Sequence, residues 1–234
     1  MIVLMALAAP ADVGTLFGIP ITGGSSQTGV PMQIVLLLTA LTVLPAAIMS
    51  ATPFLRIVIV LHFLRQALGT QTAPSNQVLV GLALFLTILV MQPVLGDMYS
   101  QGYEPVQKGE ITSQEGWTRA AVPFKTFLLK FARERDIKLF LEISHSPQPA
   151  KPSDVTLVVL VPAYTLSELK ASFQIGAVLY LPFLIIDLVV ASVTLSIGMM
   201  QLPPVMVSAP FKILLFVLVD GWNLVVGSLV KSFY

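Results

Sequence analysis

The side chains most able to do chemistry in this chain are charged residues embedded in apolar sequence. Asp187 is the only charged residue between Lys170 and Lys212. An ionised carboxylate at the centre of a membrane helix costs roughly 2.5–3.5 kcal/mol on insertion scales, so it normally faces a charged partner or a water-filled space. Lys212 begins the next apolar run, and we therefore consider a buried Asp187–Lys212 ion pair as a hypothesis.

Glu168 and Lys170 lie beside the same apolar run, two positions apart. Residues two apart point to different sides of a helix, so these two cannot pair with each other. The pattern Thr-Leu-Ser-Glu at residues 165–168 is also a capping box, in which Glu168 would fold back onto a helix start. Lys170 would then extend to the membrane edge or pair elsewhere.

Arg56 and Arg65 are nine positions apart, which places them on opposite sides of a helix. One partner cannot satisfy both guanidinium groups. The spacing predicts a helix that is contacted on two sides, as in an oligomer, although Arg65 can also simply mark the membrane edge.

Met199, Met200 and Gln201 follow Gly198 and precede a pair of prolines, which predicts a bend. Methionine is an adaptable apolar side chain. As core residues these methionines would be ordinary filler. On a loop that faces a pore, they could close around objects of different shape and seal against ions.

Small and polar residues also recur along the apolar run at spacings of three, four or seven. Such a stripe is either a helix-contact face or the lining of an aqueous path, and both interpretations stay open. The stripe comprises Gly176, Tyr180, Asp187, Ala191, Thr194, Gly198 and Gln201.

Signals for an enzyme are poor. The chain has no cysteine, and its two histidines, His62 and His145, are far apart in sequence. It contains no His-x-x-x-His pair, phosphate-binding loop, dinucleotide-binding glycine pattern or nucleophile elbow. We therefore expect no catalytic residue, no metal site and no cofactor. A net charge of +1 without a basic stripe also argues against nucleic acid as a partner.

Composition places the chain in the membrane. It is 56% hydrophobic and 11% charged, with a mean hydropathy of +0.87, whereas soluble domains average about 25% charged residues. Lipid leaves no water for exposed backbone groups, so the apolar runs are expected to be helices and the fold all-α.

Five parts follow from the distribution of apolar and charged residues. Residues 1–11 resemble a secretory signal without its basic start, and residues 12–31 are a Gly/Ser/Thr-rich loop. Residues 32–96 form an apolar helical hairpin interrupted by prolines. Residues 97–154 hold eight acidic and eight basic residues and form an aqueous, periplasmic insert. Residues 155–234 form a second apolar hairpin with the methionine bend.

The sequence of the insert also contains signals of a helix. Residues 112–115 read as a capping box, and four apolar residues recur at helical spacing with basic residues between them. We expect this helix to pack onto its neighbours rather than onto a membrane surface. Residues 155–161 are rich in β-branched side chains and suit either a strand or a buried helix. The four apolar residues are Phe124, Phe127, Leu128 and Phe131.

Three blocks of sequence resemble the FliP family of flagellar export-gate proteins. These are PAYTLSELKASFQIG at residues 162–176, LRQALGTQ with LALFLT at residues 64–71 and 82–87, and PFK with FVLVDGW at residues 210–212 and 216–222. The resemblance runs from about residue 30 to residue 234 and is closer to the flagellar than to the virulence branch.

The resemblance implies an inner-membrane protein of the flagellar basal body. It implies a homo-oligomer, a pentamer in this family, that assembles with FliQ and FliR into a helical export gate. FlhB and FlhA would associate with the gate, and FliO would assist assembly. Unfolded flagellar subunits would pass through the channel. The resemblance also implies that apolar runs are a poor guide to membrane spans in this family. The assembled gate would lie largely on the periplasmic side, and neighbouring subunits would cover its apolar surfaces.

The resemblance also assigns roles to residues. The methionine-rich gating loop of the family corresponds to Met199 and Met200, with Gln201 in place of a third methionine, so that hydrogen bonds around a ring would replace part of an apolar seal. Charged residues of the family's interior correspond to four positions here, which would pair between subunits or helices. These are Glu168, Lys170, Asp187 and Lys212.

We therefore expect a channel-forming subunit that is not an enzyme. The alternatives are a small-solute or ion transporter with Asp187 as its coupling site, a membrane-embedded hydrolase, and an assembly chaperone without a pore. A transporter would favour inverted repeats, which the sequence does not display. A hydrolase would need a nucleophile beside a base, which the two histidines do not supply.

Overall fold

The computed structural model describes residues 15–16, 19–20, 30–70, 72–147, 149, 151–198 and 203–234. It divides into two compact units, residues 1–47 and residues 48–234. In the first, β1 (Thr15–Leu16) pairs antiparallel with β2 (Ile19–Pro20), and most of the helix α2 (Val30–Ser50) follows. Nearly every large apolar side chain of α2 that is described is exposed in the single chain.

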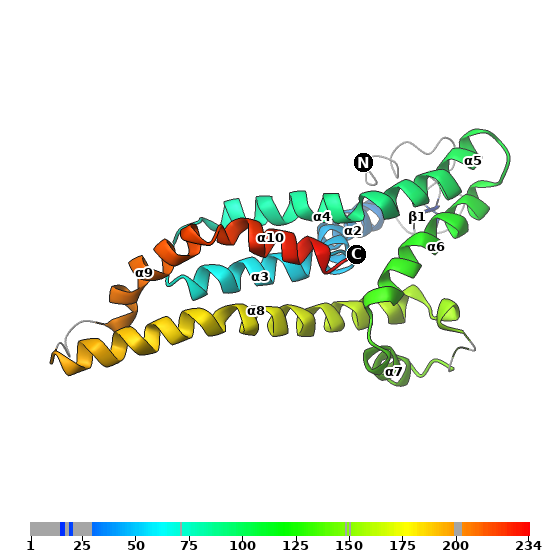
Figure 1. The fold of residues 1–234 in the computed structure, drawn as a ribbon. Helices are drawn as coiled ribbons and strands as arrows, with labels where there is room; N and C mark the ends of the chain where they lie inside the picture. The colour runs from blue at the N-terminus through cyan, green and yellow to red at the C-terminus, as the bar shows by residue number, and fades with distance from the viewer. Residues whose placement is uncertain are drawn as a thin grey trace. The chain divides into compact units, whose positions relative to one another are not determined.

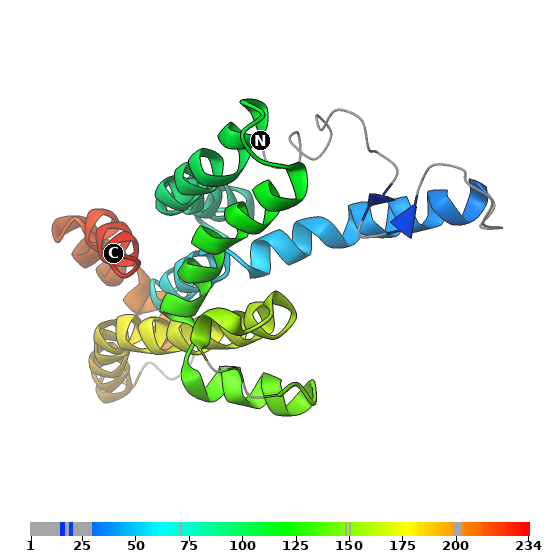
Figure 2. The same cartoon turned by 90° about the vertical axis from the view of Figure 1, so that its right-hand side faces the viewer.

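The second unit is all-helical within its described residues. Its helices are α3 (Phe54–Ala67), α4 (Asn76–Met98), the π-helical turn η1 (Tyr99–Tyr103), α5 (Glu104–Gln107), α6 (Ser113–Phe131), α7 (Glu134–Ile143), the 3₁₀ turn η2 (Pro152–Asp154), α8 (Leu157–Ser196), α9 (Pro204–Leu218) and α10 (Gly221–Lys231). Figures 1 and 2 show α3 lying along α8, with α6 and α7 at the N-terminal end of α8 and α9 at its C-terminal end.

The apolar hairpins expected at residues 32–96 and 155–234 are found as four helical segments, residues 30–67, 76–98, 157–196 and 204–231. The first is two helices, α2 and α3, separated at residues 51–53, where Pro53 precedes α3. The third begins at Leu157, so residues 155–161 mostly belong to a helix and not to a strand. The last is broken at Asp220, which has a left-handed backbone. The axes of α9 and α10 meet at this break with a bend of 67°.

The helices of this unit pack around one main core. The centre of this core consists of almost fully buried apolar residues from α3, α4, α6 and α8. Phe127 and Leu128 of α6 belong to it, which confirms that the insert helix packs onto its neighbours. A smaller cluster joins the end of α3 to α8 and α9 through Leu64, Phe183 and Phe216.

Two helices of the described residues are long and apolar enough to cross a membrane, or up to four spans form if each bent helix pair counts as one. The first extends from Asn76 to Gln107, so the helical stretch that begins with the apolar α4 continues past residue 97, where the sequence analysis expects the insert to start. The second is α8, in which only 11% of the most apolar window is buried within the chain. Its 40 residues span about 60 Å, twice the roughly 30 Å of a hydrocarbon core.

Two glycines allow η1 and α6 to approach closely. A Cβ on Gly102 would lie 2.5 Å from the Cβ of Ala120 and 2.7 Å from the carbonyl oxygen of Gly116. A Cβ on Gly116 would lie 2.2 Å from a methyl group of Val106. These distances are too short for real contacts, so the insert hairpin depends on both glycines.

We expect Gly102→Ala and Gly116→Ala each to destabilise the insert by roughly 1–3 kcal/mol, because the extra methyl group overpacks the crossing. Thermal unfolding followed by circular dichroism in detergent, with limited proteolysis of the insert, measures the effect. Gly96→Ala is the control, since Gly96 is helical and has nothing within 4 Å of an added Cβ. A melting temperature for Gly102→Ala equal to that of the control would contradict the close crossing.

Candidate functional site

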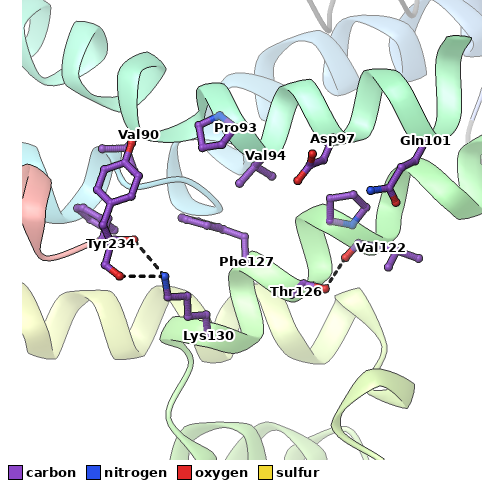
Figure 3. A pocket seen from close by; sticks show the side chains of 12 residues that line it. Val90, Pro93, Val94, Asp97, Gln101, Val122, Thr126, Phe127, Lys130 and Tyr234 are labelled. Carbon is purple, nitrogen blue, oxygen red and sulfur yellow. Dashed lines mark hydrogen bonds between the residues drawn. The ribbon is translucent and has the colours of Figure 1, made fainter.

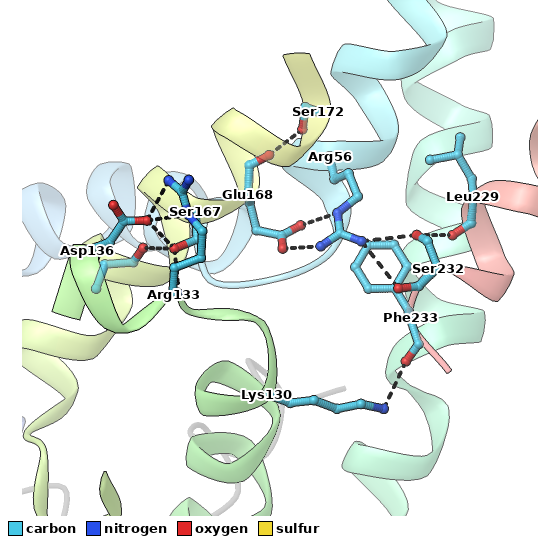
Figure 4. Close-up of polar contacts among 11 residues, drawn as sticks. Arg56, Lys130, Arg133, Asp136, Ser167, Glu168, Ser172, Leu229, Ser232 and Phe233 are labelled. Atoms are coloured by element: carbon cyan, nitrogen blue, oxygen red, sulfur yellow. Dashed lines mark hydrogen bonds and ion pairs between the residues drawn. The ribbon is translucent and has the colours of Figure 1, made fainter. Parts of the chain in front are cut away.

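Arg56 of α3 and Glu168 of α8 form a buried ion pair at the centre of the second unit (Figure 4). The side chains are 7% and 0% exposed. Arg56 Nε donates to Glu168 Oε2 at 2.7 Å, and Arg56 Nη2 donates to Oε1. The two parallel contacts make the pair bidentate, an arrangement that fixes both the distance and the orientation of the two helices.

The remaining guanidinium surface of Arg56 is covered by the segment that follows α10. Arg56 Nη1 donates to the hydroxyl oxygen of Ser232 at 3.0 Å and to its carbonyl oxygen at 3.4 Å. The ring of Phe233 lies 4.1 Å from the guanidinium carbon and is itself 3% exposed. A cation stacked on an aromatic ring in a dry site is stabilised by more than its ion pair alone. Arg56 therefore joins α3, α8 and the end of α10.

The neighbouring residue on α8, Ser167, attaches the insert. Its hydroxyl donates to Asp136 Oδ2 of α7 at 2.6 Å and accepts from the backbone N–H of Arg133 at 2.9 Å. Arg133 closes the group with Nε 2.8 Å from the same Asp136 oxygen. Consecutive residues of α8 thus bind two different parts of the fold (Figure 4).

Asp187 and Lys212 form a second ion pair, between α8 and α9. Lys212 Nζ lies 2.6 Å from Asp187 Oδ2 and 3.0 Å from the carbonyl oxygen of Ala67, at the end of α3. The hydroxyl of Ser208 donates to the other oxygen of Asp187. Lys212 is 1% exposed and Asp187 18% exposed. A lysine is favourable at the C-terminal end of a helix, which carries negative partial charge. Through these contacts the ammonium group of Lys212 joins α9 to α8 and to the end of α3.

Of the remaining predicted site residues, only Lys170 is described by the structure. Lys170 is exposed and makes no ion pair or hydrogen bond with any described residue. Met199, Met200 and Gln201 lie outside the described residues. Gly198, just before them, has a left-handed backbone with φ of 81°, which suits the glycine that ends α8.

One interpretation of Glu168 is wrong. Residues 165–168 do not begin a helix, because α8 is continuous from Leu157 to Ser196. The hydroxyl of Thr165 donates to the carbonyl of Val161 one turn earlier, as a mid-helix threonine does. Glu168 is turned instead toward Arg56. The capping box at residues 112–115 is half present, since Glu115 N–H donates to the Thr112 hydroxyl at 3.3 Å.

The two arginines of α3 do have separate partners, but these lie within the chain. Arg56 faces α8, whereas Arg65 donates to the side-chain oxygen of Asn76 at 2.5 Å. The contact on two sides of α3 therefore needs no second copy. The stripe of small and polar residues begins at Gly176, midway along α8. At this end it is a helix-contact face, because a Cβ on Gly176 would lie 2.5 Å from the ring of Phe63.

Several members of these groups were missed by sequence reasoning. No pattern in the sequence set Ser208 or Ser232 apart, and Arg133 and Asp136 lie in the charged stretch of residues 97–154. A signal existed for Ser167 only in its position beside Glu168. Among the residues that the structure describes, no group of three or more His, Cys, Asp or Glu side chains could hold a metal ion.

These features define a class: an all-helical membrane protein in which buried ion pairs connect long apolar helices. A model of the FliP family matches residues 37–229. The chain is 49% identical over 229 residues to flagellar biosynthetic protein FliP of Pectobacterium carotovorum, covering 97% of this chain and 89% of the relative. It is 50% identical over 202 residues to flagellar biosynthetic protein FliP of Bacillus subtilis, covering 86% and 91%.

The chain belongs to the FliP family. The match includes both ion pairs, since Arg56, Glu168, Asp187 and Lys212 all lie within residues 37–229. It also includes Met199, Met200 and Gln201.

Proposed function

We propose that this chain is a channel-forming subunit of the flagellar type III protein export gate. In this proposal several copies, a pentamer as the family implies, assemble with FliQ and FliR in the inner membrane. FlhB and FlhA attach to the gate, and FliO assists its assembly. The gate conducts unfolded flagellar subunits and seals the membrane when it is closed. Energy for export comes from other components.

Family membership over residues 37–229 supports the role in flagellar biosynthesis. The observation that favours an oligomer is the exposed apolar face of α8. Its large side chains from residue 178 onward are mostly more than half exposed, although the helix is strongly apolar. A single chain cannot cover this face, and lipid or neighbouring subunits must do so. We assign part of it to neighbouring copies.

The length of α8 supports a gate that extends beyond the bilayer. The 29 residues from Glu168 to Ser196 rise about 42 Å, more than the roughly 30 Å of a hydrocarbon core. The N-terminal end of the helix carries the insert, which holds most of the charged residues of the chain. We therefore place the insert and the Arg56–Glu168 pair on the periplasmic side.

The two ion pairs hold the subunit in the shape that assembly requires. Arg56 and Glu168 fix α3 and the end of α10 against α8, and Lys212 and Asp187 fix α9 against α8 and α3. Both oxygens of Asp187 are already occupied, so no observation favours a coupling site for transport at this residue. Lys170, which has no partner among the described residues, is available to pair with another subunit.

The proposed seal is tested by replacing Met199 and Met200 together with alanine in a strain that lacks its own copy of the gene. We expect flagellin export to continue while the cells become leaky to ions, because alanine leaves a wider apolar ring. Export is measured in the culture medium and leak by the membrane potential. Met206→Ala, on an exposed position of α9, is the control. Unchanged leak and export would show that the two methionines are core filler.

A further inference from the structure

The helices α9 and α10 meet at a residue with a left-handed backbone. Asp220 has φ of 51° and ψ of 50°. Aspartate tolerates this conformation better than most residues, but it still costs free energy relative to the right-handed helix. The side chain of Asn223 offsets part of the cost by donating to the Asp220 carboxylate at 3.2 Å. Strained residues persist where the surrounding structure fixes them, and they are common in segments that switch between conformations.

The bend also requires the glycine that follows. A Cβ on Gly221 would lie 2.2 Å from the ring of Phe216, and the same ring packs edge-on against Trp222 with centroids 5.4 Å apart. Nothing in the covalent chain prevents a continuous helix here, because no proline lies between residues 211 and 234. The bend is therefore set by packing, and a straight helix through residues 219–221 stays available to the chain.

The bend decides whether this part of the chain can cross a membrane. The helix α9 has 15 residues and α10 has 11, which correspond to about 22 Å and about 16 Å. Neither reaches the roughly 30 Å of a hydrocarbon core. One continuous helix over residues 204–231 would be about 42 Å long, and the pair has the length and hydropathy of a membrane span when the two helices count together. Straightening would turn two short helices into one that can cross a membrane.

The bent pair is held at its far end by Ser232, Phe233 and Tyr234, the segment that we call the latch. Ser232 accepts a hydrogen bond from Arg56 at 3.0 Å, and the ring of Phe233 lies 4.1 Å from the guanidinium carbon (Figure 4). Lys130 Nζ donates to the carbonyl oxygens of Phe233 at 3.4 Å and of Tyr234 at 3.5 Å (Figure 3). The latch therefore attaches the end of α10 to α3 and α6.

We propose that α9 and α10 form a two-state device that the latch controls. With the latch bound, the pair is bent at Asp220. When the latch leaves Arg56 and Lys130, the pair straightens into one helix and the left-handed residue becomes helical. The latch binds the same guanidinium group that holds Glu168, so the bend and the buried ion pair are coupled. The inference goes beyond the proposed export function and does not rest on it.

The test measures the distance between two spin labels on the full-length chain in detergent micelles. Met206→Cys on α9 and Ser228→Cys on α10 supply the attachment points, since both positions are exposed and the chain has no cysteine. Dilution with unlabelled chain restricts pulsed electron paramagnetic resonance to distances within one copy. The two positions lie about 28 Å apart when the helices are bent by 67° and about 33 Å apart when they are straight. We expect the labelled parent to show the shorter distance.

Three variants separate the latch from the hinge. The latch variant, Ser232→Ala with Phe233→Ala, should lengthen the distance by about 5 Å in most molecules. The hinge variant, Asp220→Ala with Gly221→Ala, should do the same with the latch in place, because alanine favours the helix and its methyl group meets Phe216. Adding Asp220→Gly to the latch variant should restore the shorter distance, since glycine adopts the left-handed conformation readily and weakens a helix.

Lys231→Ala is the matched control, because Lys231 directly precedes the latch, is exposed, and makes no side-chain hydrogen bond or ion pair with any described residue. Circular dichroism establishes that each variant keeps its helix content. A latch variant with the distance of the control would overturn the proposal, as would one whose distances spread broadly without a longer maximum. The hinge variant leaves Arg56, Lys130 and the latch unchanged, so it tests the device independently, and an unchanged distance there would also overturn the proposal.

Discussion

Arg56→Met alone is expected to destabilise the protein by about 3–5 kcal/mol, because it leaves the carboxylate of Glu168 buried without its partner. Glu168 is fully buried, and no other described cation lies within ion-pairing distance of it. Glu168→Leu should have an effect of similar size, because it leaves the buried guanidinium group of Arg56 without its carboxylate partner. Melting temperature in detergent and the amount of protein in the membrane fraction measure both effects.

The double variant Arg56→Met with Glu168→Leu separates the ion pair from the packing around it. Replacing both partners by apolar residues of similar volume is often neutral or stabilising, so the double variant should be much more stable than either single variant. Part of the loss remains, because Ser232 loses its donor and Phe233 its cation. Arg65→Met is the control on the same helix, and its exposed contact with Asn76 should contribute less than about 1 kcal/mol. Equal melting temperatures for Arg56→Met and Arg65→Met would contradict this account.

Lys212→Met is the second substitution with a large expected effect, about 2–4 kcal/mol. It removes the partner of Asp187 and leaves the carbonyl of Ala67 without its donor. The loss should be smaller than for Arg56, because Asp187 is 18% exposed and keeps the hydroxyl of Ser208. Thermal unfolding in detergent again measures it, with the exposed Lys170→Met as the control.

Exchanging the two charges, Asp187→Lys with Lys212→Asp, should restore little stability. A carboxylate at position 212 would face the carbonyl of Ala67 and the negative end of α3, where a cation is favoured. The apolar pair Asp187→Leu with Lys212→Met should recover more. A charge exchange that restored full stability would show that Ala67 contributes nothing at this site.

Sequence patterns anticipated the helical class well, because apolar runs in a chain with few charges leave helices as the main solution. They indicated Asp187 and Lys212 as partners, since these are neighbouring charges along an otherwise apolar stretch. They did not indicate that Arg56 meets Glu168, because those residues are 112 positions apart and no periodicity links them. The local capping pattern at residues 165–168 pointed to a helix start, but packing of α8 against α3 and α7 extended the helix through it. Propensity is a weak signal where tertiary contacts are extensive.

The insert shows the same limit. Its amphipathic helix α6 was predictable from spacing, whereas the crossing of η1 and α6 at Gly102 and Gly116 depends on a contact between two helices. The serines that complete both charged groups gave no distinct pattern, since one hydroxyl in a helix commonly bonds only to its own backbone.

We propose that copies of this chain meet around the export path at Gln201. The chain has no cysteine, so the single thiol of Gln201→Cys cannot form a disulfide within the chain, and a link between two copies is identified by its doubled mass. We predict that a mild oxidant will link copies into dimers and stop flagellin export, and that a reductant will restore both the monomer and export. Lys138→Cys on the exposed face of α7 is the control for the oxidant. A Gln201→Cys protein that stays monomeric, or that is linked while export continues unchanged, would contradict the claim.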